Sequence, residues 1–370
     1  MATFVALPPP IFIPPDDSHL SPPSSKKASE EPLYLSPEGS TDRYRVIEVL
    51  GRGGDATVLK VLASNVSEVA MKVYRNRKIA EREAAAYALI EGAPHLLERL
   101  DGFTLSRLYH IHQKGNIDIG PPGKGNEVMI TKLMRYPDVY NMFIKPADGG
   151  PTVLGASEVL EFGRQGLETL SFFHRKGLAH LDIKPENMFY RKGKLKIFDF
   201  GCARKFDEVD PNEGLGTPEY RSPEQILFYH YTPALADVWA LGAVLYELFT
   251  GFPILPVEGR ANELQTIVDS MFLLTKHVGV SPWDWYRGPL VREPSRKVRN
   301  NLRYFDGVGE RYGYPVWKGH IAKAVQEKNE KSDADVNKLI ALLEQMICYK
   351  GRKTAEQLLA QFGEPTEQKT

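Results

Sequence analysis

The chain contains 370 residues, and its 47 Lys and Arg residues balance its 47 Asp and Glu residues, so the formal net charge is zero. A neutral chain has no overall attraction to nucleic acid or to acidic lipid, and we expect neither as a partner. No stretch approaches the roughly 18 apolar residues of a membrane span. Two cysteines exclude a disulfide scaffold and favour a reducing compartment, so we expect an intracellular protein of the cytoplasm, the nucleus or both.

Residues 1–42 differ from the rest of the chain because they are rich in proline and serine. Proline fixes φ and has no N–H donor, so we expect an extended or disordered tail. An untethered segment is the simplest interpretation. Two alternatives stay open, namely docking to a proline-recognising partner in a polyproline conformation and phosphorylation at the Ser-Pro steps 21–22 and 36–37.

The next third of the chain has the pattern of a sheet. Alternating apolar and β-branched residues predict strands, and a run of strong helix formers predicts one charged, amphipathic helix. In chain order we expect strands over 44–50, 57–62 and 67–74, a helix over 76–90, and strands over 103–112 and 127–133, with a turn at 120–125.

Helical spacing of apolar residues dominates the chain beyond Pro137. It predicts helices over 157–176 and 232–248, and a strand pair over 188–190 and 194–198 lies between them. The second helix is a nearly continuous apolar run, but it is too short for a membrane span. A sheet-rich first third followed by a helix-rich remainder predicts an α+β fold with two dissimilar lobes.

Three glycines, Gly51, Gly53 and Gly54, lie between the first two predicted strands. Closely spaced glycines allow backbone amides to approach phosphate oxygens without an intervening side chain. The pattern is weak by itself, because a glycine cluster between strands is more often a simple hairpin turn. It is also not a P-loop, since no Gly-Lys-Ser/Thr sequence follows.

Lys72 stands near the end of the third predicted strand. A lysine in such a place commonly just extends to solvent. It can instead reach the α- and β-phosphates of a nucleotide if a carboxylate of the following helix holds it. Glu81 and Glu83 are the candidates, and we favour Glu83 because it lies one turn before Tyr87 on what should be the same helix face.

A denser pattern is the sequence HLDIKPEN at 180–187, followed twelve residues later by DFG at 199–201. It places Asp182, Lys184, Asn187 and Asp199 on loops at the ends of short predicted strands. Phosphoryl transfer needs a carboxylate for the proton of the acceptor hydroxyl, a cation beside the phosphoryl oxygens, and oxygen ligands for magnesium. These four residues supply all three requirements.

Over about residues 44–362 these motifs resemble those of the eukaryotic protein kinases of the serine/threonine type. Three later motifs follow in the family's order: GTPEYRSPE at 216–224, DVWALG at 237–242, and Arg352, which the resemblance pairs with Glu224. The resemblance implies a bilobal kinase fold. Its N-lobe, at 43–135, would be a small antiparallel sheet with one main helix. Its larger, mostly helical C-lobe would occupy 136–364, with an extended segment at about 253–345 and a short tail at 365–370.

The resemblance also implies the role of each site residue, with ATP and Mg²⁺ as cofactors and a protein carrying Ser or Thr as substrate. It makes Asp182 the catalytic base, places Lys184 beside the transferred phosphoryl group, lets Thr217 support both, and assigns Mg²⁺ to Asn187 and Asp199. For the phosphates of ATP it implies contact with Lys72, which Glu83 holds in place, and a cover formed by Gly51, Gly53 and Gly54. For the adenine it implies contacts with Val58, Ala70 and Phe189. It also implies a hinge from Lys132 to Met134, preceded by Thr131.

The chain departs from the family's pattern in its phosphate loop and its activation loop. Ala56 stands where the third glycine of the loop usually lies, and Gly54 can supply the lost flexibility. Leu181 replaces the arginine that usually receives the phosphate of the activation loop, and residues 202–216 contain no Ser, Thr or Tyr. We therefore hypothesise that activity does not depend on activation-loop phosphorylation.

Three function classes compete on this sequence. We favour a protein serine/threonine kinase that uses Mg-ATP. The alternative is a catalytically weak kinase-fold scaffold, or pseudokinase, against which the retained Lys72, Asp182, Lys184, Asn187 and Asp199 count. A small-molecule phosphotransferase is the third class, and the substrate-groove segment 216–224 argues against it.

Overall fold

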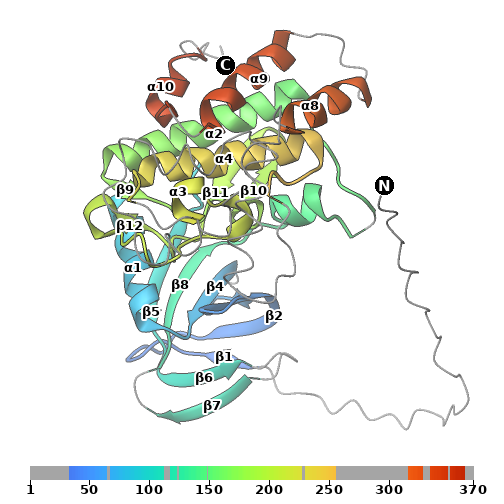
Figure 1. Cartoon of the computed structure of the whole chain (residues 1–370). Helices are drawn as coiled ribbons and strands as arrows, with labels where there is room; N and C mark the ends of the chain where they lie inside the picture. Colours follow the sequence, from blue (N-terminus) through green and yellow to red (C-terminus); the bar gives the residue numbers. More distant parts are fainter. Residues whose placement is uncertain are drawn as a thin grey trace, which may run out of the picture. The chain divides into compact units, whose positions relative to one another are not determined.

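The computed structural model of the chain describes residues 33–64, 67–111, 117–122, 125–147, 149–226, 230–255, 316–327, 334–348 and 351–362. Contacts between residues divide the chain after Leu33, and the compact unit that contains the described elements begins at Tyr34. Figure 1 shows this unit, with its strands drawn in blue to green and its large helices in green to red.

An antiparallel sheet forms the N-lobe, in the strand order β1-β2-β3-β4-β8-β5 (Figure 1). The strands are β1 (Tyr34–Leu35), β2 (Tyr44–Arg52), β3 (Ala56–Leu62), β4 (Glu68–Tyr74), β5 (Arg99–Thr104) and β8 (Glu127–Lys132). Helix α1 (Arg77–Leu89) follows β4, and the Asn76 side chain caps it by accepting from the N–H of Lys78. The sheet and the single main helix agree with the fold expected from the sequence.

The predicted strand over 103–112 is wrong, because the structure divides this region into two strands. β5 ends at Thr104 within the main sheet, and β6 (Arg107–Ile111) pairs with β7 (Ile117–Pro122) in a separate hairpin. Leu105 marks the break, since it is fully buried and its N–H and C=O bond to Asn126 and Gly125. The predicted turn at 120–125 therefore begins too early, and prolines stand in β7 where a two-stranded edge tolerates them.

The predicted boundary of the tail at residue 42 also needs correction. β1 pairs with β2 in the register Tyr34↔Arg45 and Leu35↔Tyr44, and Leu35 is fully buried. Pro37 forms an isolated bridge with Leu105, so the second Ser-Pro step belongs to the packed unit. A two-residue strand has no periodicity of its own and forms only because β2 offers an edge. Residues 1–32 lie outside the described part.

Two long helices form the core of the C-lobe: α2 (Ala156–Arg175) and α4 (Pro233–Thr250). They can approach closely because α2 carries Gly163 and Gly166 at the contact. A Cβ atom on either glycine would lie 2.9 Å from a methyl carbon of Leu245 or Leu241 of α4. By length and apolar composition α4 could cross a membrane, but 94 % of it is buried inside the protein, as in the core helix of a globular lobe.

Shorter elements surround these helices. They are β9 (Leu178–Ala179) paired with β12 (Arg204–Lys205), β10 (Met188–Arg191) paired with β11 (Lys194–Ile197), α3 (Pro223–Ile226), α8 (Val316–Glu327), α9 (Ala334–Met346) and α10 (Ala355–Leu359). A π-helical turn spans Tyr140–Ile144, and 3₁₀ turns span Pro185–Asn187, Phe206–Glu208 and Pro218–Tyr220. Of the extended segment expected at 253–345, the parts 256–315 and 328–333 lie outside the described residues.

Candidate active site

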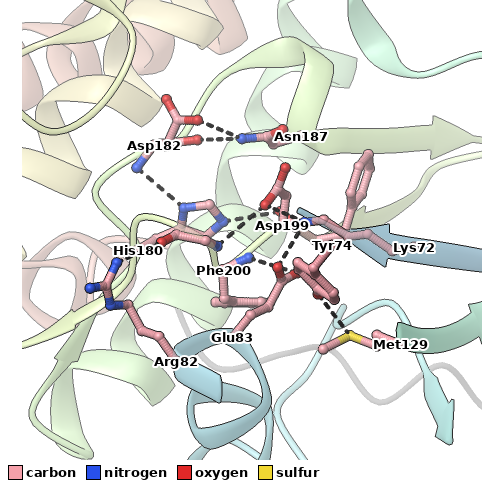
Figure 2. A network of polar contacts seen from close by, with 12 residues as sticks. Lys72, Tyr74, Arg82, Glu83, Met129, His180, Asp182, Asn187, Asp199 and Phe200 are labelled. Carbon is pink, nitrogen blue, oxygen red and sulfur yellow. Dashed lines mark hydrogen bonds and ion pairs between the residues drawn. The ribbon is translucent and has the colours of Figure 1, made fainter. Parts of the chain in front are cut away.

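Lys72 lies between two carboxylates that come from different parts of the chain (Figure 2). Its Nζ is 2.7 Å from Glu83 Oε2 of α1 and 2.8 Å from Asp199 Oδ1, which follows β11. The side chains of Lys72 and Glu83 are 17 % and 2 % exposed. Glu81, the other candidate, pairs instead with the exposed Arg77. The structure thus forms the predicted ion pair with Glu83.

Electrostatics keeps Lys72 and Asp199 charged. Burial lowers the pKa of Lys72, but the Glu83 and Asp199 carboxylates outweigh burial and the pKa is raised. Burial favours a higher pKa for Asp199, yet the cation of Lys72 and the N–H of Gly201 hold it below its ordinary value. Burial raises the pKa of Glu83, which is the most deeply placed group of the three.

Phe200 anchors the segment that presents Asp199. Its ring packs against Tyr87, Phe173 and His180, with centroid distances of 4.9, 5.3 and 4.9 Å. Its N–H donates to Glu83 Oε1 at 3.3 Å. Because Phe200 is fully buried, Asp199 is held beside Lys72 by the core of the molecule.

Asp182 is oriented by three neighbours. Its Oδ1 accepts from the Thr217 hydroxyl at 2.8 Å, and its Oδ2 accepts from the Asn187 amide at 3.1 Å. Lys184 Nζ lies 3.3 Å from the same Oδ2 and donates to Thr217 Oγ1 at 2.9 Å. Four predicted site residues therefore form one connected group, and both oxygens of the central carboxylate are held in place.

Asp237 supports the backbone before Asp182, a role that sequence reasoning missed. Its buried carboxylate, on the first turns of α4, accepts the N–H groups of His180 and Leu181 at 2.8 Å each. The ring of His174 in α2 lies 3.0 Å from the same carboxylate. An aspartate inside a continuous apolar helix was the available signal, because a buried carboxylate requires hydrogen-bond partners.

Gly53 and Gly54 of the phosphate loop lie in the β2–β3 turn, as predicted, whereas Gly51 belongs to β2 and pairs with Val58 of β3. Gly53 N–H donates to the carbonyl of Ala56 at 2.9 Å, which closes the turn. Ala56 is the first residue of β3, pairs with Tyr74 and is buried. Its methyl group therefore belongs to the core, so the loop does not require a third glycine at this position.

The residues predicted around the adenine come together on neighbouring strands. Ala70 of β4 pairs with Thr131 of β8, and Val58 of β3 pairs with Lys72. Lys132 ends β8, so Lys132 to Met134 form the start of the connection to the C-lobe. On the C-lobe side, Phe189 of β10 stacks on Phe198 with a centroid distance of 4.5 Å. Their contacts with a nucleotide stay predictions.

The segment 216–224 is tied to the C-lobe by two buried groups. Arg352 Nη2 lies 3.1 Å from Glu224 Oε1, and its guanidinium stacks over Trp239 at 4.9 Å. The Tyr220 hydroxyl donates to Glu247 of α4 at 2.7 Å. The predicted pair of Arg352 and Glu224 is therefore formed.

The family profile of the protein kinase domain matches residues 44–361 of the sequence. This chain belongs to the protein kinase family. It is 31 % identical over 291 residues to a putative CBL-interacting protein kinase 13 of Oryza sativa subsp. japonica. That match covers 74 % of this chain and 50 % of the relative. It is 28 % identical over 308 residues to the serine/threonine-protein kinase AtPK2/AtPK19 of Arabidopsis thaliana, and this match covers 82 % of this chain and 61 % of the relative.

A third relative is mitogen-activated protein kinase 18 of Arabidopsis thaliana, 29 % identical over 259 residues. That match covers 66 % of this kinase and 39 % of the relative. The chain thus spans about half the length of these relatives. Membership in the family implies the use of ATP and a divalent cation.

The donor atoms of this kinase suit that cation. The side-chain amide nitrogen of Asn187 donates twice to Asp182, which leaves the side-chain carbonyl oxygen of Asn187 to bind the cation. The side chain of Asp199 is 39 % exposed although one of its oxygens bonds to Lys72. A carboxylate and an amide oxygen are hard oxygen ligands of the kind that Mg²⁺ prefers, so the residues present fit the expected group.

Proposed function

We propose that this kinase transfers the γ-phosphate of ATP, bound with Mg²⁺, to a Ser or Thr hydroxyl of a protein substrate. The observation that carries the proposal is the hydrogen-bonded group of Asp182, Lys184, Thr217 and Asn187 beside the Lys72–Asp199 ion pair. The spacing of Lys184 two residues after Asp182, followed by Pro-Glu-Asn, supports serine and threonine as acceptors.

The residues of the chain have distinct parts in this reaction. Asp182 orients the acceptor hydroxyl and takes its proton, and the bonds from Thr217 and Asn187 fix the direction of its carboxylate. Burial lowers the pKa of Lys184, but Asp182 and Glu186 outweigh burial, so Lys184 stays a cation. When bound, ATP would supply the phosphoryl group, and a Mg²⁺ ion held by Asn187 and Asp199 would neutralise part of the phosphate charge.

We also propose that activity does not depend on a phosphate in the activation loop. Leu181 is buried with Ala179 and Ala236, and Val209 and Leu215 of the loop pack on this cluster. Apolar contacts therefore stand where a kinase with arginine at position 181 would hold a phosphate. They help to anchor the loop by burial of apolar surface, which requires no modification.

Polar contacts support the same loop. Arg221 donates to the carbonyls of Gly214 and Gly216, and the bond to Gly216 from its Nε is 2.9 Å long. Arg204 pairs with Glu213 at 2.9 Å. Arginines of the chain itself thus bind the loop through carbonyl and carboxylate groups.

The test is transfer of labelled γ-phosphate from Mg-ATP to degenerate peptide libraries with Ser, Thr or Tyr as the acceptor. We expect labelling of Ser and Thr peptides by the wild type, and loss of labelling in Asp182→Asn and Lys72→Met. Phosphatase treatment should leave the rate unchanged, with mass spectrometry confirming that Thr217 and Tyr220 are unmodified. A wild type that binds Mg-ATP but labels nothing would favour the scaffold, and a rate that tracks a loop phosphate would overturn independence from phosphorylation.

Two further proposals concern the setting of the enzyme. The first is that the proline-rich segment 1–32 binds a proline-recognising partner. The second is an intracellular location, which suits a chain with two cysteines, Cys202 and Cys348, that are both free thiols. Deletion of residues 1–32 should abolish capture by SH3- or WW-type domains and leave peptide phosphorylation intact.

A further inference from the structure

Arg75 makes an unusual set of contacts with the phosphate loop. It directly follows β4, the strand that carries Lys72. Its Nη1 donates to the carbonyls of Gly53 at 2.5 Å and Gly54 at 2.9 Å, and its Nη2 donates to the Thr57 hydroxyl at 2.9 Å. One guanidinium therefore holds both sides of the turn between β2 and β3.

The backbone of Arg75 joins the same loop. Its N–H donates to the carbonyl of Asp55 at 2.8 Å, which continues the β3–β4 pairing one step beyond Ala56 and Tyr74. Residues alternate between the faces of a strand, so Arg75 lies on the face opposite Lys72 and Tyr74. That Lys72 and Tyr74 share a face is seen directly, since Lys72 Nζ lies 5.3 Å from the centre of the Tyr74 ring.

These contacts determine where the amides of the loop point. In a trans peptide the C=O and the following N–H point in opposite directions. Because the carbonyls of Gly53 and Gly54 point toward Arg75, the N–H groups of Gly54 and Asp55 point away from it. They are thereby directed to the face on which Lys72 lies, where phosphate oxygens would require donors.

We propose that Arg75 is a positioning residue that holds the phosphate loop with its amide donors directed at the phosphates of the nucleotide. The proposal rests on the proposed use of ATP. The adjacent glycines Gly53 and Gly54 lose much conformational entropy when the loop becomes ordered. The hydrogen bonds from Arg75 offset this cost. Arginine suits this task because its rigid fork serves several acceptors at once, whereas lysine is a single point donor.

Hydrogen exchange in the nucleotide-free protein tests the structural half of the proposal. In Arg75→Ala, exchange of a peptide covering 51–58 should accelerate by about tenfold, which is about 1.4 kcal/mol of lost protection. Arg75→Lys should recover only part of it, and Thr57→Val should give a smaller change in the same direction. The matched control is Arg77→Ala, since Arg77 is an exposed arginine two residues on that pairs with Glu81 and does not contact the loop.

Calorimetric titration tests the phosphate half. Arg75→Ala should weaken binding of Mg-ATP by about five- to tenfold, while the affinity for adenosine, which carries no phosphate, should equal that of the wild type. A merely structural role would weaken both ligands equally.

The outcomes separate this proposal from the proposed function. Exchange and Mg-ATP affinity equal to those of Arg77→Ala would overturn the role of Arg75, as would equal losses for ATP and adenosine. A wild type that binds no nucleotide would overturn both proposals. A wild type that binds Mg-ATP tightly, shows the predicted effects of Arg75→Ala and phosphorylates nothing would support Arg75 and count against the proposed activity.

Discussion

Replacing Lys72 by Met should destabilise the kinase in a manner that depends on pH. Methionine nearly keeps the volume of the side chain but removes the cation from between Glu83 and Asp199. Asp199 is partly exposed and can be hydrated, whereas Glu83 is only 2 % exposed and keeps the N–H of Phe200 as a donor. The loss of stability in Lys72→Met therefore comes mainly from the unpaired carboxylate of Glu83.

The magnitude follows from the two ways in which Glu83 can respond. Removing one partner of a buried ion pair costs about 3–5 kcal/mol when the remaining group stays charged. Glu83 can instead take a proton. At pH 7 this costs a carboxyl with the ordinary pKa of 4.5 about 3.4 kcal/mol, since each pH unit corresponds to about 1.4 kcal/mol. Protonation of Glu83 therefore limits the destabilisation to about 3.4 kcal/mol at pH 7 and to about 1.4 kcal/mol at pH 5.5.

The sign of the pH dependence follows from the same proton. In Lys72→Met the pKa of Glu83 in the folded state lies above its unfolded value, because burial acts without the opposing cation. The variant is therefore least impaired below about pH 4.5, where Glu83 is protonated in both states, and its deficit grows as pH rises until it passes the folded pKa.

Urea unfolding between pH 5.5 and 8 measures this deficit. The double variant Lys72→Met/Glu83→Gln has no charge at positions 72 and 83 and should recover most of the loss at pH 7, with little pH dependence. Arg77→Met, at an exposed ion pair, should be unchanged and is the control. A deficit that is constant with pH, or a double variant as unstable as the single one, would refute the reasoning.

Three further predictions concern other contacts of the site. Asp182→Asn should slow peptide phosphorylation by about 10²–10⁴-fold with Mg-ATP affinity retained in calorimetry, and an equal loss of affinity would contradict a role in the transfer step. Tyr220→Phe should lower the unfolding free energy by about 1.5–3 kcal/mol, because Glu247 loses a buried donor; urea unfolding decides, and no change would refute it. Arg352→Met should cost about 3 kcal/mol and Glu224→Gln clearly less, because Met also loses the bonds of Arg352 to the carbonyls of Leu235 and Cys348, whereas Gln keeps an oxygen that accepts from Arg352; thermal unfolding of both variants tests that order.

Elements with strong periodicity were predictable from the sequence. Helix formers over 76–90 and apolar spacing over 157–176 and 232–248 correspond to α1, α2 and α4 within two residues at each end. The failures lie where tertiary contacts decide. Alternation continues through Leu105, so only its bonds to residues 125 and 126 show that one strand ends there.

The site was predictable in part for a different reason. Lys72, Asp182, Asn187 and Asp199 stand in ordered motifs, and the resemblance to kinases gave them roles that spacing alone could not. Arg75 was not found, because its importance depends on the antiparallel register that sets it opposite a turn about 20 residues earlier in the chain.

The glycines of α2 connect the position of the catalytic loop to the contact between α2 and α4. Gly166 lets α4 approach so closely that even a methyl group there would press on Leu241. Leu241 lies one turn after Asp237, whose carboxylate holds the backbone before Asp182. An alanine at position 166 would therefore force the side chain of Leu241 to shift, one turn from the residue that supports the catalytic loop, so a substitution at this helix contact can reach the loop from a distance.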